Sequence, residues 1–286
     1  YTIHRTPLTV EDLKAHVILT DTLLSVPTLL ARLPNSKLDM SGIEMSMPLD
    51  SARLQAPFRI DAQLTPSDVA LFVPNLNGFK RPLALSGSLD GSLDSVAFTD
   101  LALRYNGKKV LDGDVSIAGL PDLSNPYLCA KLTDFHTNAA QIQDILSQLK
   151  GQPVHLPQPL HRLGDIHYRG TAQGQLQNMT LHGAFRTALG AITTDGMFRA
   201  DSTFDNVAFD ARVVGRSFRL GRMFDDPKMG SVTLDLASTG TITDGQVSGE
   251  VDAHVRDLTY NNYTYNDLDM KGYYAPKHYN GQCAIH

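Results

Sequence analysis

The chain of 286 residues is short of charged residues, cysteines and long hydrophobic runs. Charged residues make up 19%, below the usual quarter, and a net charge of −5 leaves no basic surplus for binding nucleic acid. Two cysteines, Cys129 and Cys283, are too few for a disulfide scaffold, and Cys129 lies in an apolar run that predicts a buried position. No apolar run reaches the roughly 18 residues of a membrane-spanning helix, because Asp21 and Pro27 interrupt the best candidate. Since an apolar content of 42% also excludes intrinsic disorder, a globular fold is expected.

Alternation of apolar and polar residues dominates the chain, as in residues 101–105, 115–117 and 232–236. Most of these runs are short and are bounded by dipeptides that tolerate the positive φ of tight turns. The dipeptides are Asn-Gly at 106–107 and Asp-Gly at 90–91, 112–113, 195–196 and 244–245. Many short strands joined by hairpins predict an all-β, mostly antiparallel fold.

Three stretches break the alternation and predict short helices, each after a strand. Residues 66–72 begin with Pro66, which suits a first helical turn. Residues 138–149 carry apolar residues at spacings of three and four, with Thr137 or Asn138 able to cap the start and Gly151 after the end. Residues 220–224 allow at most a single helical turn.

An internal repeat is the most informative feature of the sequence. A shift of 83 residues places four of the five glycines between residues 87 and 119 on another glycine. The pairs are Gly87 with Gly170, Gly91 with Gly174, Gly107 with Gly190, and Gly113 with Gly196. Each unit is expected to be several hairpin strands followed by a short helix, and repeated units that stack on their neighbours predict an elongated molecule.

The repeat divides the chain into four segments. These are 1–82, with a linking helix near 66–72, then repeat units at 83–165 and 166–233, and the start of a truncated third unit at 234–286. Both ends interrupt the pattern, since the chain begins at Tyr1 and stops at His286. We therefore expect the chain to be an internal piece of a longer protein.

Glycine turns and alternating strands combine in the phrases GSLDGSLDSVAF at 87–98, LALRYNG at 101–107 and GDVSIAGLP at 113–121. Together with PSDVALFVP at 66–74, they resemble the TamB/AsmA-like family of the Gram-negative envelope over about residues 55–275. The resemblance implies a β-taco groove in the periplasm, within an inner-membrane-anchored protein of outer-membrane biogenesis. It further implies either phospholipid transport between the inner and outer membranes, or a scaffold that assists the translocation and assembly of outer-membrane proteins with an Omp85-type partner.

An apolar trough could shield phospholipid acyl chains without any catalytic residue, because their exposure to water costs about 0.8 kcal/mol per methylene. The candidate lining residues alternate along strands of the two repeat units. They are Val96, Phe98, Leu101, Leu103, Val115, Ile117, Met179, Leu181 and Phe198. The same alternation also builds a closed sandwich in which these residues are core. The two differ in exposure, since a compact fold of this mass exposes about 12,000 Å² and an open groove exposes more.

No motif for enzymatic chemistry is present: the sequence has no Gly-x-Ser-x-Gly elbow, no P-loop and no His-Glu-x-x-His. We therefore expect a non-enzymatic protein without a cofactor or a metal. His155, His161 and His167 recur every six residues, a spacing that fits neither a helix face nor one strand, and they predict a polar linker rather than a zinc site. Single histidines such as His136 and His182 are expected at exposed or turn positions.

A tyrosine-rich stretch at 260–274 allows two interpretations. Tyr260, Tyr263 and Tyr265 predict cross-strand aromatic pairs in a hairpin that turns at Asn261 and Asn262. Alternatively, the rings form a sugar-binding platform on an extracellular β-sandwich that binds glycans. The chaperone function, in contrast, would require free strand edges that pair with outer-membrane β-proteins.

Overall fold

The computed structural model describes residues 9–47, 53–69, 81–120, 125–150, 152–203, 205–243, 245–276 and 278–286. The chain divides into two compact units. Unit 1 is Tyr1–Pro126 with Asp144–Val154, and unit 2 is Tyr127–Gln143 with His155–His286.

Unit 1 consists mainly of strands, with one helical turn after the fourth strand. Its elements are β1 (Asp12–Leu19), β2 (Leu23–Arg32), β3 (Lys37–Ser46), β4 (Phe58–Leu64), α1 (Pro66–Val69), β5 (Leu83–Gly91), β6 (Ser95–Tyr105) and β7 (Lys108–Ala118). Unit 2 has longer strands with short helices between them. The remaining elements are β8 (Tyr127–Asn138), α2 (Ala139–Lys150), α3 (Gln158–His161), β9 (Asp165–Gln175), β10 (Asn178–Thr187), β11 (Gly190–Ala200), β12 (Asn206–Phe218), α4 (Leu220–Phe224), β13 (Met229–Thr243), β14 (Gln246–Tyr260), β15 (Tyr263–Ala275) and β16 (His278–Ile285). Of these, α2 begins in unit 2 and belongs to unit 1 from Asp144 onward.

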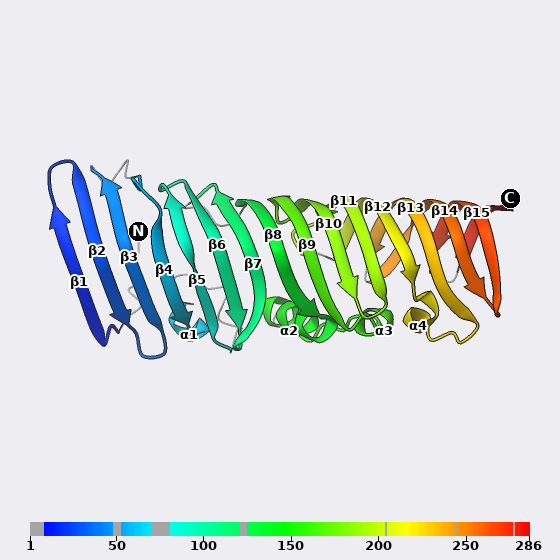
Figure 1. Cartoon of the computed structure of the whole chain (residues 1–286), viewed down its shortest axis with the longest axis horizontal. Helices are drawn as coiled ribbons and strands as arrows, with labels where there is room; N and C mark the ends of the chain where they lie inside the picture. Colours follow the sequence, from blue (N-terminus) through cyan, green and yellow to red (C-terminus); the bar gives the residue numbers. More distant parts are fainter. Residues whose placement is uncertain are drawn as a thin grey trace. The chain divides into compact units, whose positions relative to one another are not determined.

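In each unit the strands lie side by side in the order of the sequence, and each strand pairs antiparallel with the next (Figure 1). The prediction of a mostly antiparallel all-β fold with a few short helices is therefore confirmed. The strong contacts of each strand are with its sheet neighbours, so neither unit closes into a sandwich. The accessible surface of 18145 Å² agrees, because a compact protein of this mass exposes only about 12,000 Å².

The predicted helices are confirmed within the part of the chain that the structure describes. α1 begins at Pro66, although residues 70–72 of the predicted helix lie outside the described residues. α2 starts after Asn138, whose side-chain Oδ1 accepts a hydrogen bond of 2.9 Å from the backbone N–H of Gln141. α4 ends at Phe224 and is followed by Asp225, which adopts a left-handed conformation with φ of 62°.

Two of the predicted Asp-Gly turns are wrong. Asp112-Gly113 lies within β7 and Asp195-Gly196 within β11, and both glycines are buried. Gly196 is needed for close packing, because a Cβ at this position would lie 2.9 Å from the Cβ of Ala211 on β12. The Asn106-Gly107 turn is confirmed, with φ of 52° and 74°.

The repeat has a structural counterpart in the order of the elements. The first copy places β5 to β8 before α2, and the second places β9 to β12 before α4. Gly91 is the last residue of β5 and Gly174 the last but one of β9, and both have a positive φ, of 147° and 129°. The division into four segments stays a prediction.

Bulges keep the apolar residues of a strand on one face where the alternation of the sequence breaks. In β6 the register shifts between Phe98 and Leu101, and Asp100 between them has a φ of 52°. In β12 the shift lies between Gly215 and Phe218, with Ser217 at a φ of 49°. An extra residue in one strand restores the side on which the following residues lie.

Cross-strand glycine pairs in unit 2 lie against aromatic rings. Gly170 pairs with Gly183, and a Cβ on either glycine would come within 2.8 Å of Tyr168. The Gly240–Gly249 pair lies against Phe209 in the same way, since a Cβ on Gly240 would be 2.9 Å from its ring. The rings occupy the space that the missing side chains leave, a known means of stabilising glycine in sheets.

We expect Gly183→Ala to lower the free energy of unfolding by about 1–3 kcal/mol, because the new methyl group would overlap the Gly170 backbone and the Tyr168 ring. Gly215→Ala is the matched control, since its Cβ would meet Ile192 at an ordinary 3.6 Å. The control should leave stability unchanged or raise it by up to about 1 kcal/mol. Urea unfolding of both variants measures the difference, and equal effects would contradict the packing explanation.

Candidate functional site

The apolar face of unit 2 is the most distinctive surface of the protein. Residues that pair across neighbouring strands lie on the same face of the sheet, as do Leu181 with Gly196 and Phe209 with Gly240. We define the apolar face by its apolar side chains from β10 to β15. They are Met179, Leu181, Phe185, Ile192, Phe198, Phe209, Val213, Leu234, Leu236, Val251, Ala253, Val255, Leu268 and Met270.

Most side chains in the middle of this face are only half-buried. Leu181, Val213 and Leu236 belong to this group, and none of them is packed under a second sheet. Part of the surface of each of these side chains therefore remains accessible. An apolar sheet face without a covering layer is unusual for a monomeric domain and indicates an interaction surface.

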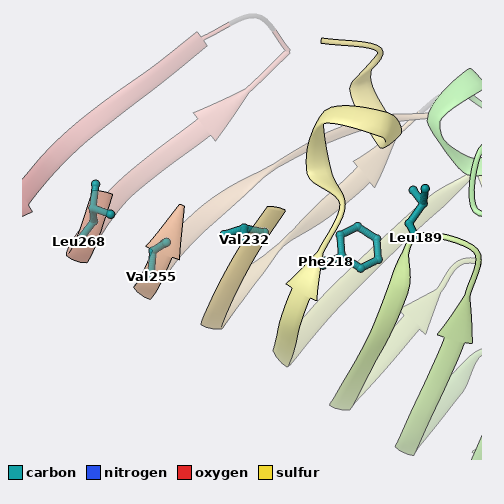
Figure 2. Close-up of a cluster of buried hydrophobic side chains, with 5 residues drawn as sticks. All are labelled: Leu189, Phe218, Val232, Val255 and Leu268. Carbon is teal, nitrogen blue, oxygen red and sulfur yellow. The ribbon is translucent and has the colours of Figure 1, made fainter. Parts of the chain in front are cut away.

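One edge of the apolar face is closed. Leu189, Phe218, Val232, Val255 and Leu268 form a buried cluster there, and Figure 2 shows their side chains in a row beside the turn of α4. Leu163, Leu220 and Met223 pack against this row. We call this side of unit 2 the closed edge.

Hydrogen bonds fix the closed edge. The Arg162 guanidinium donates to the backbone O of Met223 at 3.1 Å and to Asp225 Oδ2 at 2.8 Å, which joins the residue after α3 to α4. The backbone N–H groups of Ala188 and Arg219 donate to the O atoms of Leu163 and Leu189 at 2.8 and 2.9 Å. The loops at this edge are therefore tied to one another.

All nine residues predicted to line a trough are half-buried, and in each unit they share one face. In unit 1, Phe98 pairs with Val115 and Val96 with Ile117, and the bulge at Asp100 brings Leu101 and Leu103 to the same side. In unit 2, Met179 pairs with Phe198, and Leu181 follows on the same side of β10. Their role in binding stays a prediction.

The sequence analysis did not predict the closed edge as a cluster. Val232 and Val255 belong to alternating runs, but Leu189 lies in a turn and Leu268 follows the irregular position Asp267, so alternation does not mark these two. The helical pattern at 220–224 did indicate part of this edge, because Leu220 and Met223 of that helix pack on the buried cluster.

The opposite face of unit 2 is polar and carries histidine–aspartate pairs. His254 Nδ1 lies 2.8 Å from Asp269 Oδ1, and His182 Nδ1 lies 3.6 Å from Asp195 Oδ2. These histidines lie within strands rather than in turns.

Cys129 is exposed rather than buried as predicted. Its neighbours in β8, Leu128 and Ala130, pair with Gly174 and Ala172 on the apolar side of β9, so the Cys129 side chain lies on the opposite side.

Two histidine rings stack on this polar face. The rings of His136 and His167 are 4.4 Å apart and nearly parallel, and His167 Nδ1 lies 3.0 Å from Asp134 Oδ1. The prediction of a polar linker is wrong for His161 and His167, which lie in α3 and β9. Within the described ranges, no group of histidine, cysteine and acidic side chains could hold a metal ion.

Two shallow hollows lie over the polar face of unit 2. One of about 600 Å³ is lined by residues of β9 to β12, including Arg169, His182 and Arg212. Another of about 440 Å³ includes Asp210, Glu250 and Lys271. Their charged side chains of both signs and their openness to solvent are typical of a solvated face.

The tyrosine-rich stretch forms the predicted hairpin. Asn261 and Asn262 turn between β14 and β15 with φ of 50° and 63°, and Tyr260 pairs with Tyr263 across the turn. The rings of Tyr263 and Tyr265 meet edge to face at 4.8 Å. This ring contact joins two residues of the same strand, so the hairpin is confirmed while the cross-strand aromatic pairs stay a prediction.

Ionic contacts on the polar face lower the pKa of two carboxyl groups, those of Asp235 and Asp269. Hydrogen bonds from the Arg212 guanidinium, at 2.8 Å from Nε to Oδ1, hold the pKa of Asp235 below its ordinary value. The hydrogen bond with His254, together with His286, lowers the pKa of Asp269. Burial raises the pKa of the Tyr168 hydroxyl, which donates to the backbone O of Thr171 at 2.8 Å.

In the described part of the chain, no helix is long and apolar enough to cross a membrane. Comparisons with protein-family models, curated proteins and solved structures give no match to this chain.

Acid should weaken the sheet through the two shifted aspartates. Their folded-state pKa values lie below the ordinary 3.8, so their stabilisation is complete above that pH and is lost as the pH falls through the folded-state values. We expect the urea midpoint to fall between about pH 5 and pH 2, and to fall less in the double variant Asp235→Asn and Asp269→Asn. Equal acid dependence in both proteins would contradict this assignment.

Proposed function

We propose that the chain is a non-enzymatic, periplasmic β-groove segment that shields phospholipid acyl chains as they pass between the inner and outer membranes. The observation that supports this function is the uncovered apolar face. The resemblance of the sequence to the TamB/AsmA-like family suggests the membrane context and the longer, inner-membrane-anchored protein.

The apolar face suits acyl chains because it is broad and lacks charge. The larger side chains from β10 to β15 are aliphatic or aromatic, and the charged side chains of these strands, such as Arg212 and Asp235, lie on the opposite face. Flexible chains need contact area rather than directed hydrogen bonds, and each buried methylene contributes about 0.8 kcal/mol.

The face also suits a ligand that moves. Side chains such as Leu181, Val213 and Leu236 are at similar depth, since all are half-buried. Rings that lie against the glycine pairs fill gaps in the surface near Gly183 and Gly240. Contacts that are similar from strand to strand would let a chain slide without crossing a large barrier.

The test is native mass spectrometry with lipid extraction on purified protein. We expect bound phospholipid in the wild type and at least about a tenfold loss in Leu181→Asp, because a carboxylate on the apolar face opposes acyl contact. Thr193→Asp is the matched control, since it adds the same charge to an exposed position on the neighbouring strand β11. The control should keep its lipid.

A second pair of variants tests the same prediction if Leu181→Asp does not fold. Phe98→Asp and Thr99→Asp alter adjacent residues of β6, of which Phe98 is half-buried and Thr99 exposed. Circular dichroism and urea unfolding identify the variants that fold. Folded wild-type protein without lipid, even after incubation with phospholipid vesicles, would overturn the proposal. If such protein instead captured unfolded outer-membrane β-proteins, the scaffold function would replace it.

A further inference from the structure

We propose that unit 2 holds its amphiphile in one direction, with the acyl chain toward the closed edge and the polar group at a row of hydroxyl groups across β11, β13 and β15. This inference rests on the proposed function, because it concerns how the same face orients the same class of ligand.

Exposure along the strands differs between the two ends of the apolar face. At the closed edge Val232 and Val255 are only 2% and 5% exposed, beneath α4 and its neighbours. At the other end of β14, where the strand begins after the β13–β14 turn, Val247 is 42% exposed. An apolar chain end is therefore best shielded near the closed edge, and a hydrated group is best placed away from it.

The first polar side chains beyond the closed edge lie on a diagonal across alternate strands, because Thr194 is level with Leu236 and Tyr274 with Gly240. They are Thr194 on β11, Ser238 on β13 and Tyr274 on β15. Ser238 donates from Oγ to the backbone O of Glu250 at 2.7 Å, and its Oγ lies 2.9 Å from the Tyr274 hydroxyl. We call these three residues the hydroxyl row.

The face between the closed edge and the hydroxyl row is apolar. On β13 it consists of Leu234 and Leu236, and on β14 of Ala253. These side chains offer no hydrogen-bond partner, so a polar group placed among them would lose its water without compensation.

The length of this apolar stretch is of the same order as that of an acyl chain. Ser238 lies six positions after Val232, and at about 3.3 Å per residue the two span roughly 20 Å. The hydrocarbon of one membrane leaflet is about 15 Å thick, half of the roughly 30 Å core. A chain whose methyl end reaches the closed edge therefore places its ester and headgroup near the hydroxyl row.

The chain's lack of tryptophan allows a direct test with single-tryptophan variants on β14. Leu258→Trp reports from the closed edge, where Leu258 packs against the buried cluster. Val251→Trp reports from the hydroxyl row, because Val251 pairs with Ser238. Asp252→Trp, on the polar face beside it, is the control.

Fluorescence is measured with phosphatidylcholine that carries a nitroxide quencher at carbon 5 or carbon 16 of one chain. We expect Leu258→Trp to be quenched at least twofold more by the carbon-16 label, and Val251→Trp at least twofold more by the carbon-5 label. Asp252→Trp should respond to neither. Equal or reversed quenching would overturn the orientation and leave acyl binding intact. No quenching in either folded reporter would overturn the proposed function as well.

Adjacent tyrosines on opposite faces provide an independent test. Tyr274→Phe removes a hydroxyl group of the row, whereas Tyr273→Phe removes one from the exposed polar face. We expect Tyr274→Phe to weaken phospholipid binding about fivefold, the effect of one hydrogen bond, and Tyr273→Phe to leave binding unchanged. Unchanged binding in both variants would remove the hydroxyl row from the proposal.

Discussion

A sheet of one layer must shield its apolar face without help from a second sheet, and this constraint governs both units. Apolar side chains such as Leu181 and Leu236 lie beside their cross-strand neighbours and are only half-buried, so part of their surface stays accessible. The protein is consequently stabilised by lateral contacts between strands more than by a deep core. No large side chain in the described part of the chain is completely buried.

Three local features of the structure compensate for the missing second layer. Bulges such as the one at Asp100 keep apolar residues on one side where alternation fails. Aromatic rings lie against glycine pairs, as Tyr168 does against Gly170 and Gly183. Short helices and loops cover one edge, where Arg162 ties the residue after α3 to α4. What remains uncovered is the middle of the apolar face, which is the part available to a ligand.

The polar face keeps the sheet in water and adds charge pairs of a repeated kind. His254 with Asp269 and Arg212 with Asp235 join neighbouring strands across this face. Exposed pairs of this type contribute little to stability one at a time. Their more general effect is to make the two faces chemically unlike, so that a one-residue slip in register would expose apolar side chains to water and move charge to the apolar face.

The sequence by itself determined the antiparallel all-β fold, the 83-residue repeat, the three helices and the hairpin at Asn261, because each depends on residues close together in the chain. It also placed Phe98 and Val115 in strands of alternating pattern. Only the tertiary structure decided that Asp112-Gly113 lies within a strand, that the sheet stays open, and that Leu189 joins Val255 at a closed edge. These features depend on register and on contacts between distant strands, which a local pattern does not encode.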